Sequence, residues 1–436
     1  MLLALLLLAL APQNSHTAEN LRGVSTPTQQ IAWASGTHGT YLRTTDAGKT
    51  WLAAQVPGAE SLDFRAVVAF TADEAFLMSA GPGDQSRIYH TTNGGRHWSL
   101  QFANKHPQGF FDSMVFWDRT HGIVLGDPIP DASGISKFEL LLTEDGETWK
   151  PLPSDALPAA QNDEGAFAAS NSCIAVLPAA SKEGRNAKGP DAKGRDTDEP
   201  ALNEPRTNGR GEPAANQRNT TGKDEPTTNQ TNITGKDEPT TNQTNTTGKD
   251  EPTMNQTNTT GKGTTFSRAV SSKKSTGASA PGVNIWFATG GAAARVFHSP
   301  DGGKTWEVTV TPIMHGPDSA GIFSIAFRDA THGVIAGGDY KQPTQDGPNL
   351  AFTTDGGRTW TLSPIHPQQY FSAASFDHKS PKTVYIVAPD SVLTINTSTN
   401  SKPQKSTFKL NAVSPLPKAG ILGVGPKGQI VRIPHQ

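Results

Sequence analysis

The sequence predicts an all-β fold of repeated four-stranded sheets, interrupted by one long disordered insertion. Three observations support this prediction. The 436 residues include 43 Gly and 33 Pro, as expected of a turn-rich chain, and one short motif recurs along the chain. In addition, residues 179–281 contain almost no aromatic or branched apolar side chains. Such a stretch buries too little apolar surface to offset its conformational entropy, so we expect it to be disordered.

Five of the eight tryptophans close the same motif, which reads Thr-x-Asp-Gly-Gly-x-Thr-Trp at residues 353–360. An Asp or Asn side chain accepts hydrogen bonds from turn amides, Gly supplies positive φ, and Trp packs under the turn. The motif therefore predicts hairpin turns and says little about chemistry. Its Asp or Asn and its Trp are Asp46 and Trp51, Asn93 and Trp98, Asp145 and Trp149 (in a copy one residue shorter), Asp301 and Trp306, and Asp355 and Trp360.

A second repeated element marks the start of each unit. An apolar residue opens a short strand, and an apolar run, a Gly-rich turn and the strand leading to the motif follow. The seven starts are Leu21, Phe64, Phe111, Phe167, Phe323, Phe371 and Leu410. Four strands per unit and about 46 residues per unit are typical of a propeller blade. We therefore predict a single seven-bladed β-propeller. Six blades are the alternative, because the last two units lack the motif.

The domain organisation follows from these elements. The Leu/Ala-rich run within residues 1–11 suits a signal peptide and is too short to span a bilayer, so we expect an exported, periplasmic or secreted protein. Residues 12–178 hold blades 1–3 and the start of blade 4, and residues 282–436 hold the remainder. The insert at 179–281 replaces the turn between the first two strands of blade 4. Residues 12–19 are expected to supply the outer strand missing from blade 7.

Polar residues occupy the second position of most strand starts, where the flanking residues are apolar. These residues are Arg22, Arg65, Asp112, Ser324, Ser372 and Asn411. Strand alternation predicts that they point together toward the central channel or its mouth. They either line a water-filled channel or form a recognition ring in which Arg22 and Arg65 bind a carboxylate or another anion. Further candidates from the loops around the ring are His38, Asp127, Arg295, Asp339 and Tyr340.

The strand starts, the Gly-rich middles and the closing motif resemble the photosystem II stability/assembly factor family of BNR (Asp-box), WD40/YVTN-like bacterial propellers. The resemblance covers about residues 19–178 and 282–436. It implies a non-catalytic assembly scaffold whose basic surface patch contacts a client protein. The expected partner is therefore another protein, with a glycan as the alternative, and we expect a monomer. A net charge of −2 without a Lys/Arg cluster argues against nucleic-acid binding.

An enzyme is the competing hypothesis, because Asp-boxes are also typical of sialidases. A sialidase should carry Arg-Ile-Pro before the first box, whereas Arg432-Ile433-Pro434 lies at the C-terminus. A carbohydrate-active enzyme of another type is the alternative hypothesis, in which Asp112 and Asp127 would form the pair of catalytic carboxylates. The sequence has no dinucleotide-binding turn, no haem-attachment motif and no metal-ligand spacing, so we expect no cofactor and no metal. Its only cysteine, Cys173, allows no internal disulfide.

Overall fold

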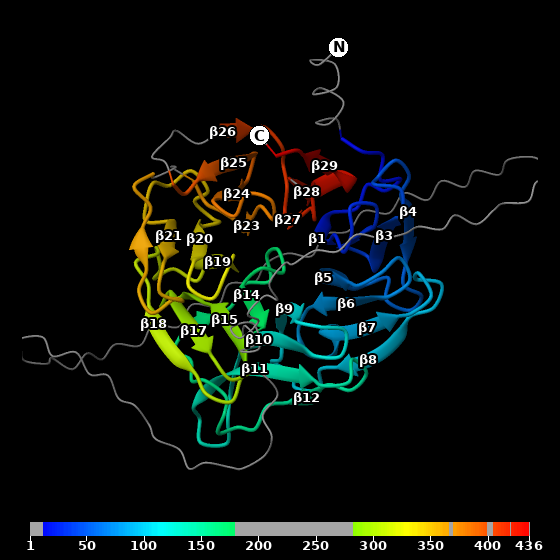
Figure 1. The fold of residues 1–436 in the computed structure, drawn as a ribbon. Helices are drawn as coiled ribbons and strands as arrows, with labels where there is room; N and C mark the ends of the chain where they lie inside the picture. The colour runs from blue at the N-terminus through cyan, green and yellow to red at the C-terminus, as the bar shows by residue number, and fades with distance from the viewer. Residues whose placement is uncertain (1–11, 179–281, 366–368, 399–403, 419, 436) are drawn as a thin grey trace, which may run out of the picture. The chain divides into compact units, whose positions relative to one another are not determined.

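The computed structural model describes residues 12–178, 282–365, 369–398, 404–418 and 420–435. In these residues the regular elements are β-strands and two 3-10 turns, Gly83–Gln85 and Pro426–Gly428, which confirms the predicted all-β class. The expected signal peptide (1–11) and disordered insert (179–281) lie outside the described residues. The described strands form seven antiparallel sheets arranged around a central axis (Figure 1).

Blades 1 to 3 each contain four strands that follow one another from the centre outward. Blade 1 comprises β1 (Leu21–Ser25), β2 (Ala32–Gly36), β3 (Thr40–Thr44) and β4 (Leu52–Gln55). Blade 2 comprises β5 (Asp63–Ala69), β6 (Ala75–Ala80), β7 (Arg87–Thr91) and β8 (Ser99–Ala103). Blade 3 comprises β9 (Phe111–Phe116), β10 (Gly122–Pro130), β11 (Ser136–Thr143) and β12 (Lys150–Pro151).

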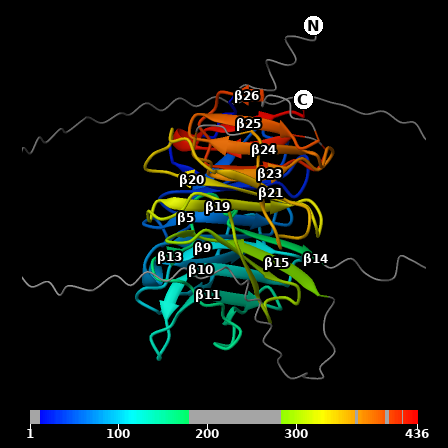
Figure 2. The ribbon, with the colours of Figure 1, turned by 90° about the vertical axis from the view of Figure 1, so that its left-hand side faces the viewer.

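Blades 4 to 6 repeat this order with one addition. Blade 4 comprises β14 (Ile174–Pro178), β15 (Val283–Ala288), β17 (Arg295–Ser299) and β18 (Glu307–Val310). Blade 5 comprises β19 (Ala320–Phe327), β20 (Gly333–Asp339), β21 (Leu350–Thr353) and β22 (Thr361–Leu362), and β13 (Glu164–Gly165) and β16 (Gly290–Gly291) extend its inner edge. Blade 6 comprises β23 (Ala373–Phe376), β24 (Thr383–Ala388), β25 (Ser391–Asn396) and β26 (Gln404–Ser406); β23 to β25 lie one above another in Figure 2.

Blade 7 closes the ring with β27 (Ala412–Pro415), β28 (Ile421–Val424) and β29 (Ile430–Ile433). The innermost strands contact one another in ring order, and β27 contacts β1. Seven blades are therefore confirmed, and the six-bladed alternative is wrong. Residues 12–19 form no strand, but the Gln13 amide donates to the Ile430 carbonyl at 2.8 Å and the Gly428 amide donates to the Glu19 carbonyl at 2.7 Å. The N-terminal segment thus holds the outer edge of the last blade.

Blade 4 departs from the prediction at its first strand. The strand begins at Ile174 rather than at Phe167, because Phe167 stacks on Phe323 of blade 5 at 3.9 Å between ring centres. At the other end of this strand, Pro178 pairs with Val283. The Gly302 amide also donates to the Val283 carbonyl at 3.0 Å. The two ends of the undescribed stretch 179–281 therefore lie side by side, next to the Asp-box of the same blade.

The Asp-box turns are held by hydrogen bonds of one repeated pattern. In the fifth box, the Asp355 carboxylate accepts the Thr359 amide at 2.9 Å and the Thr359 hydroxyl at 2.6 Å. The Thr353 hydroxyl donates to the same carboxylate at 2.8 Å and accepts the Gly357 amide at 2.9 Å. This box has two glycines at positive φ, whereas the shorter third box has Gly146 alone. The predicted hairpin turn thus tolerates the loss of one residue.

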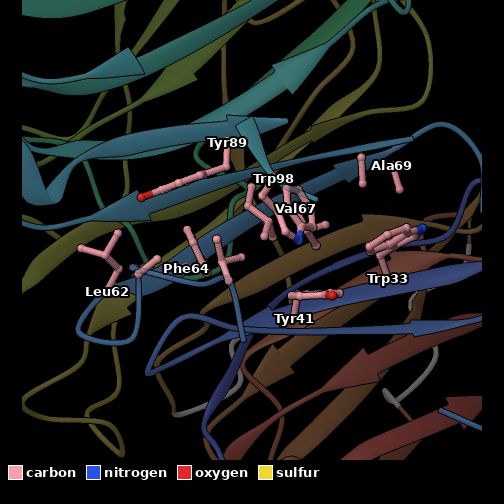
Figure 3. Packing of buried hydrophobic residues seen from close by; sticks show 12 residues of the cluster. Trp33, Tyr41, Leu62, Phe64, Val67, Ala69, Tyr89 and Trp98 are labelled. Atoms are coloured by element: carbon pink, nitrogen blue, oxygen red, sulfur yellow. The ribbon is translucent and has the colours of Figure 1, made fainter. Parts of the chain in front are cut away.

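Each Asp-box tryptophan packs in the seam between its own blade and the preceding one. Trp98 of blade 2 contacts Tyr41 and Trp33 of blade 1, with ring centres 5.2 Å and 6.1 Å apart (Figure 3). The other four tryptophans fill their seams in the same way: Trp51 between blades 7 and 1, Trp149 between 2 and 3, Trp306 between 3 and 4, and Trp360 between 4 and 5. The core consists of seven apolar clusters, one per seam, and the 5–6 and 6–7 clusters contain no tryptophan.

We expect Trp98→Ala to lower the free energy of unfolding by about 3–5 kcal/mol, because the truncation leaves a cavity between two blades. Chemical denaturation followed by circular dichroism measures the change. Leu100→Ala is the matched control: Leu100 lies on β8 in the same blade, is 51% exposed and should change stability by less than about 0.5 kcal/mol. Equal losses in the two variants would show that the seam tryptophan is not a major source of stability.

The box carboxylates predict a loss of stability in acid. Hydrogen bonds from the Thr50 hydroxyl and then the Thr50 amide lower the pKa of Asp46 from 3.8 to about 2. The stabilisation by this carboxylate is therefore complete above pH 3.8 and is lost as the pH falls through about 2. We expect Asp46→Asn, which mimics the natural Asn93 box, to flatten the decline of Tm between pH 4 and pH 2. An unchanged decline would assign the acid sensitivity to other carboxylates.

Candidate functional site

A pocket of about 660 Å³ opens at the central mouth of the propeller. Its walls come from the beginnings of the innermost strands and from the loops at the same ends of the blades, whereas the Asp-box turns lie at the opposite ends. Seven of the lining residues belong to innermost strands or directly precede them: Arg22, Arg65, Phe110, Asp112, Phe323, Ser372 and Asn411. The ladder skips Arg22, Arg65, Asp112 and Phe323, each at a β-bulge near the start of its strand. This repeated arrangement brings most of the expected ring of polar residues to one place.

One wall of the pocket is basic, because Arg22 and Arg65 share a single carboxylate partner, Asp63. The Arg65 Nε donates to Asp63 Oδ2 at 2.9 Å, and an Arg22 guanidinium nitrogen lies 3.5 Å from the same oxygen. A second guanidinium nitrogen of Arg65 donates to the Ala168 carbonyl at 2.8 Å. One carboxylate thus faces two guanidinium groups, which leaves this wall with an excess positive charge. Both arginine side chains stay about one-quarter exposed, so they can reach a ligand.

The neighbouring wall carries two carboxyl groups of blade 3. Asp112 is 1% exposed, and burial followed by repulsion from Asp127 raises its pKa well above 3.8. Burial also raises the pKa of Asp127 to about 6, although its carboxylate accepts the Ala166 amide at 3.0 Å. Asp112 therefore holds its proton more readily than an ordinary aspartate does, whereas Asp127 is ionised above about pH 6.

The remaining side of the pocket is aromatic. Phe323 stacks on Phe167 and meets the Tyr370 ring edge-on, with a centre-to-centre distance of 4.8 Å. Tyr340 is 48% exposed and stands 6.1 Å from Phe323. The pocket thus places a half-exposed apolar surface opposite two arginines. This combination suits a ligand that has both an anionic and an apolar part.

Three buried polar atoms at this mouth have no hydrogen-bond partner among the described residues. They are Arg22 Nε, Asp63 Oδ1 and Asp112 Oδ2. Buried polar groups normally find a partner, because leaving one unsatisfied costs about 1–3 kcal/mol. The mouth therefore has both donor and acceptor capacity that water or a ligand can use.

The predicted candidates divide into two groups. Arg22, Arg65, Asp112, Asp127, Tyr340, Ser372 and Asn411 line the pocket. The Asn411 side chain donates to Asn20 Oδ1 and to the Leu21 carbonyl, both at 2.7 Å, so it also bridges blades 7 and 1. Ser324, predicted to point with these residues, is fully buried and accepts the Ala374 amide at 2.8 Å.

The positions predicted for three loop candidates need correction. Arg295 does not line the pocket, because its guanidinium pairs with the buried Glu164 of β13. Asp339 is 3% exposed and accepts the Lys341 amide at 2.9 Å, so it shapes the loop that carries Tyr340. His38 pairs with Glu19 at 2.7 Å, outside the pocket lining.

The sequence analysis missed several residues that shape the pocket. Asp63 lies two positions before Arg65 on β5, a spacing from which strand alternation predicts a shared face, and the two side chains meet although the ladder is irregular at Arg65. Phe167 lines the pocket but was predicted to begin a strand. Lys409 also lines the pocket, and no motif in the sequence identified it. Within the described residues no three His, Cys, Asp or Glu side chains form a metal-binding group, and no helix is long and apolar enough to cross a membrane.

Residues 11–128 match the family model described as photosynthesis system II assembly factor YCF48. The chain is an Asp-box β-propeller that resembles this family. The matched region contains all four charged residues that line the arginine and aspartate walls of the pocket, Arg22, Arg65, Asp112 and Asp127. A search of the curated proteins found no match.

Two solved structures share the fold of this propeller. The first, described as YCF48 bound to D1 peptide, has a TM-score of 0.54 and 11% identity, covering 98% of this chain and 96% of that one. The second is YCF48 from Cyanidioschyzon merolae, with a TM-score of 0.50 and 14% identity, covering 98% of this chain and 99% of that one. At these identities the comparison establishes the common architecture.

The raised pKa of Asp127 predicts a stability that falls as the pH rises. The folded state holds this proton up to about pH 6, whereas the unfolded state releases it near 3.8. The cost of ionising the buried Asp127 carboxyl group therefore does not reduce stability below pH 3.8, and it reduces stability in full above pH 6. We expect Asp127→Asn to stabilise the protein by about 1–2 kcal/mol at pH 7.5, a value reduced for partial solvent access, and by little at pH 4. Denaturation at both pH values measures this; an equal effect at the two would contradict the assignment.

Proposed function

We propose that this propeller is a non-catalytic, exported scaffold that binds a segment of a client protein at its central mouth and supports the assembly or stability of that client. The observation that carries the proposal is the pair of arginines sharing Asp63 beside an aromatic wall. A guanidinium group binds a carboxylate through charge-assisted hydrogen bonds, and the unpartnered Arg22 Nε offers a donor for one.

The size and chemistry of the pocket favour a peptide segment. A volume of about 660 Å³ accommodates several side chains, and the walls offer separate places for a carboxylate and for an apolar side chain. Burial keeps the pKa of Asp112 well above 3.8, so this group offers a hydrogen-bonding partner that repels an acidic segment less than an ordinary aspartate would. We therefore infer a client segment that combines acidic and apolar residues.

The comparisons support a scaffold role at the level of the fold. The family model is that of an assembly factor, and one structure of similar architecture is described as bound to a peptide. Export rests on the apolar N-terminal run of the sequence, and a monomeric state is part of the same proposal.

A photo-crosslinking experiment tests this function. Benzoylphenylalanine introduced at Tyr340, on the rim of the pocket, should trap a discrete client in cells that produce the protein. Arg65→Ala should weaken client binding about tenfold or more, because a charge-assisted hydrogen bond contributes about 1.5–3 kcal/mol. The measurement is the yield of the adduct, followed by titration of the purified client.

Two controls make the result specific. Benzoylphenylalanine at Leu100, an exposed residue of the outer strand β8, should not trap the same client. Arg96→Ala removes an exposed arginine that donates to the Asn93 carbonyl within its own Asp-box turn, and it should leave binding unchanged. The proposal fails if both crosslinker positions trap the same proteins, or if the Tyr340 adduct persists at full yield when Arg65 is replaced by Ala in a folded protein.

A further inference from the structure

A second cavity of about 410 Å³ lies in the seam between blades 5 and 6. We call it the seam groove and define it by lining residues from both blades: Arg328, Phe352 and Ile365 of blade 5, and Phe376, Lys382 and Ile395 of blade 6. It also includes Thr353, which opens the blade 5 Asp-box, Asn396 at the end of β25, and Thr397 and Ser398 directly after it. The groove therefore begins on the Asp-box side of the propeller, at the opposite ends of the strands from the mouth pocket.

The position of the seam groove follows from a missing tryptophan. In five seams, the Asp-box of one blade inserts its tryptophan against the preceding blade. In blade 5, Thr353 opens the Asp-box and pairs with Gly333 at the start of β20. In blade 6, Asn396 pairs with Thr383 at the start of β24. Asn396 therefore occupies the position of the threonine that opens an Asp-box. Counting from there, Pro403 occupies the sequence position of Trp360. The blade 5–6 seam thus lacks the aromatic ring that fills its neighbours.

The blade 6–7 seam also lacks a tryptophan but is closed in another way. The buried Asp377 of blade 6 accepts the Tyr385 hydroxyl at 3.0 Å and the Gly420 amide of blade 7 at 2.9 Å. His435 lies 3.3 Å from the same carboxylate. Among the described residues, the seam between blades 5 and 6 has one side-chain bridge near the groove, from Arg328 to the Pro381 carbonyl at 3.0 Å.

The groove combines an apolar floor with a basic rim. Phe352 and Ile365 pack against the seam cluster yet stay half-buried, so part of each side chain faces the groove. Arg328 and Lys382 stand on the rim. Lys382 is exposed and forms no ion pair with any described residue, and Arg328 is matched by Asp329 alone at 3.3 Å. The rim therefore keeps a positive charge that can attract an anion.

We propose that the seam groove binds a large aromatic side chain, tryptophan above all, presented by a protein partner next to acidic residues. The ring would occupy the volume that the Asp-box tryptophan fills in the neighbouring seams, and the acidic neighbours would meet Lys382 and Arg328. In this mode of binding, a side chain of the partner fills the space between blades 5 and 6. It is separate from the mouth pocket, because the two share no lining residue.

Three short peptides test the proposal on the full chain: acetyl-Glu-Trp-Glu-amide, acetyl-Gln-Trp-Gln-amide and acetyl-Glu-Ala-Glu-amide. Methyl NMR of Ile365 and Ile395 reports on the groove. The first peptide should give saturable shifts of both methyl groups at millimolar concentration, the second should bind about two- to fivefold more weakly, and the third should give none. The absence of saturable shifts with the first peptide, or equal shifts with the third, would overturn the proposal.

Two variants locate the site. Ile365→Trp fills the groove from its own wall and should abolish the shift of Ile395 without lowering Tm. Lys382→Met changes an exposed side chain only, so it tests the rim even if the first variant folds poorly. It should weaken the acidic tryptophan peptide about two- to fivefold and leave the glutamine peptide unchanged. Lys405→Met, on the outer strand of the same blade, is the matched control. Equal effects of the two lysine variants would refute a role for the rim.

Discussion

The structure depends on the packing of one blade against the next. Each blade buries the two faces of its sheet against its two neighbouring blades, so the apolar core is divided into seven clusters that each belong to two blades. The Asp-box makes this packing specific, because the carboxylate fixes the turn and the turn delivers the tryptophan. The contact is reinforced from the preceding blade: the Tyr41 hydroxyl donates to the Gly95 carbonyl at 2.8 Å, and the Trp286 indole donates to the Gly356 carbonyl at 2.9 Å. Both acceptors lie in box turns.

This constraint explains what the sequence revealed about the fold. Repeated local chemistry is readable without a structure, so the five tryptophans predicted the hairpins and the spacing predicted seven blades. The prediction failed at Phe167, where a contact between two blades decides the position of the residue. Phe167 has the apolar character of a strand start, but a stacking partner from blade 5 holds it in a loop at the mouth, and the strand begins later. A contact between distant segments of this kind leaves no periodic signal.

The site was predictable to the extent that it lies on strands. Arg22, Arg65 and Asp112 occupy the same repeated position near the starts of β1, β5 and β9. Each sits at a β-bulge, so the repeated position rather than a regular strand brings the three side chains together. Loop residues were less predictable. Arg295 was assigned to the ring by its position, yet Glu164, 131 residues away in the sequence, removes it from the site. Of the aromatic wall, the sequence analysis named Tyr340 as a candidate. It took Phe167 and Phe323 for apolar strand starts, although Phe167 lies in a loop and Phe323 lines the pocket from β19.

The closure of the ring also bears on the order in which the molecule is completed. Gln13 bonds to Ile430 through the backbone, and its side chain accepts the indole hydrogen of Trp51 at 2.9 Å, so the first and last blades share one short segment. During synthesis, the N-terminal segment must wait for nearly the entire chain before its native partner exists. Contacts between such remote residues form late and slow the overall rate of folding. The final step of folding is therefore expected to join the two ends of the chain, whatever order the middle blades follow.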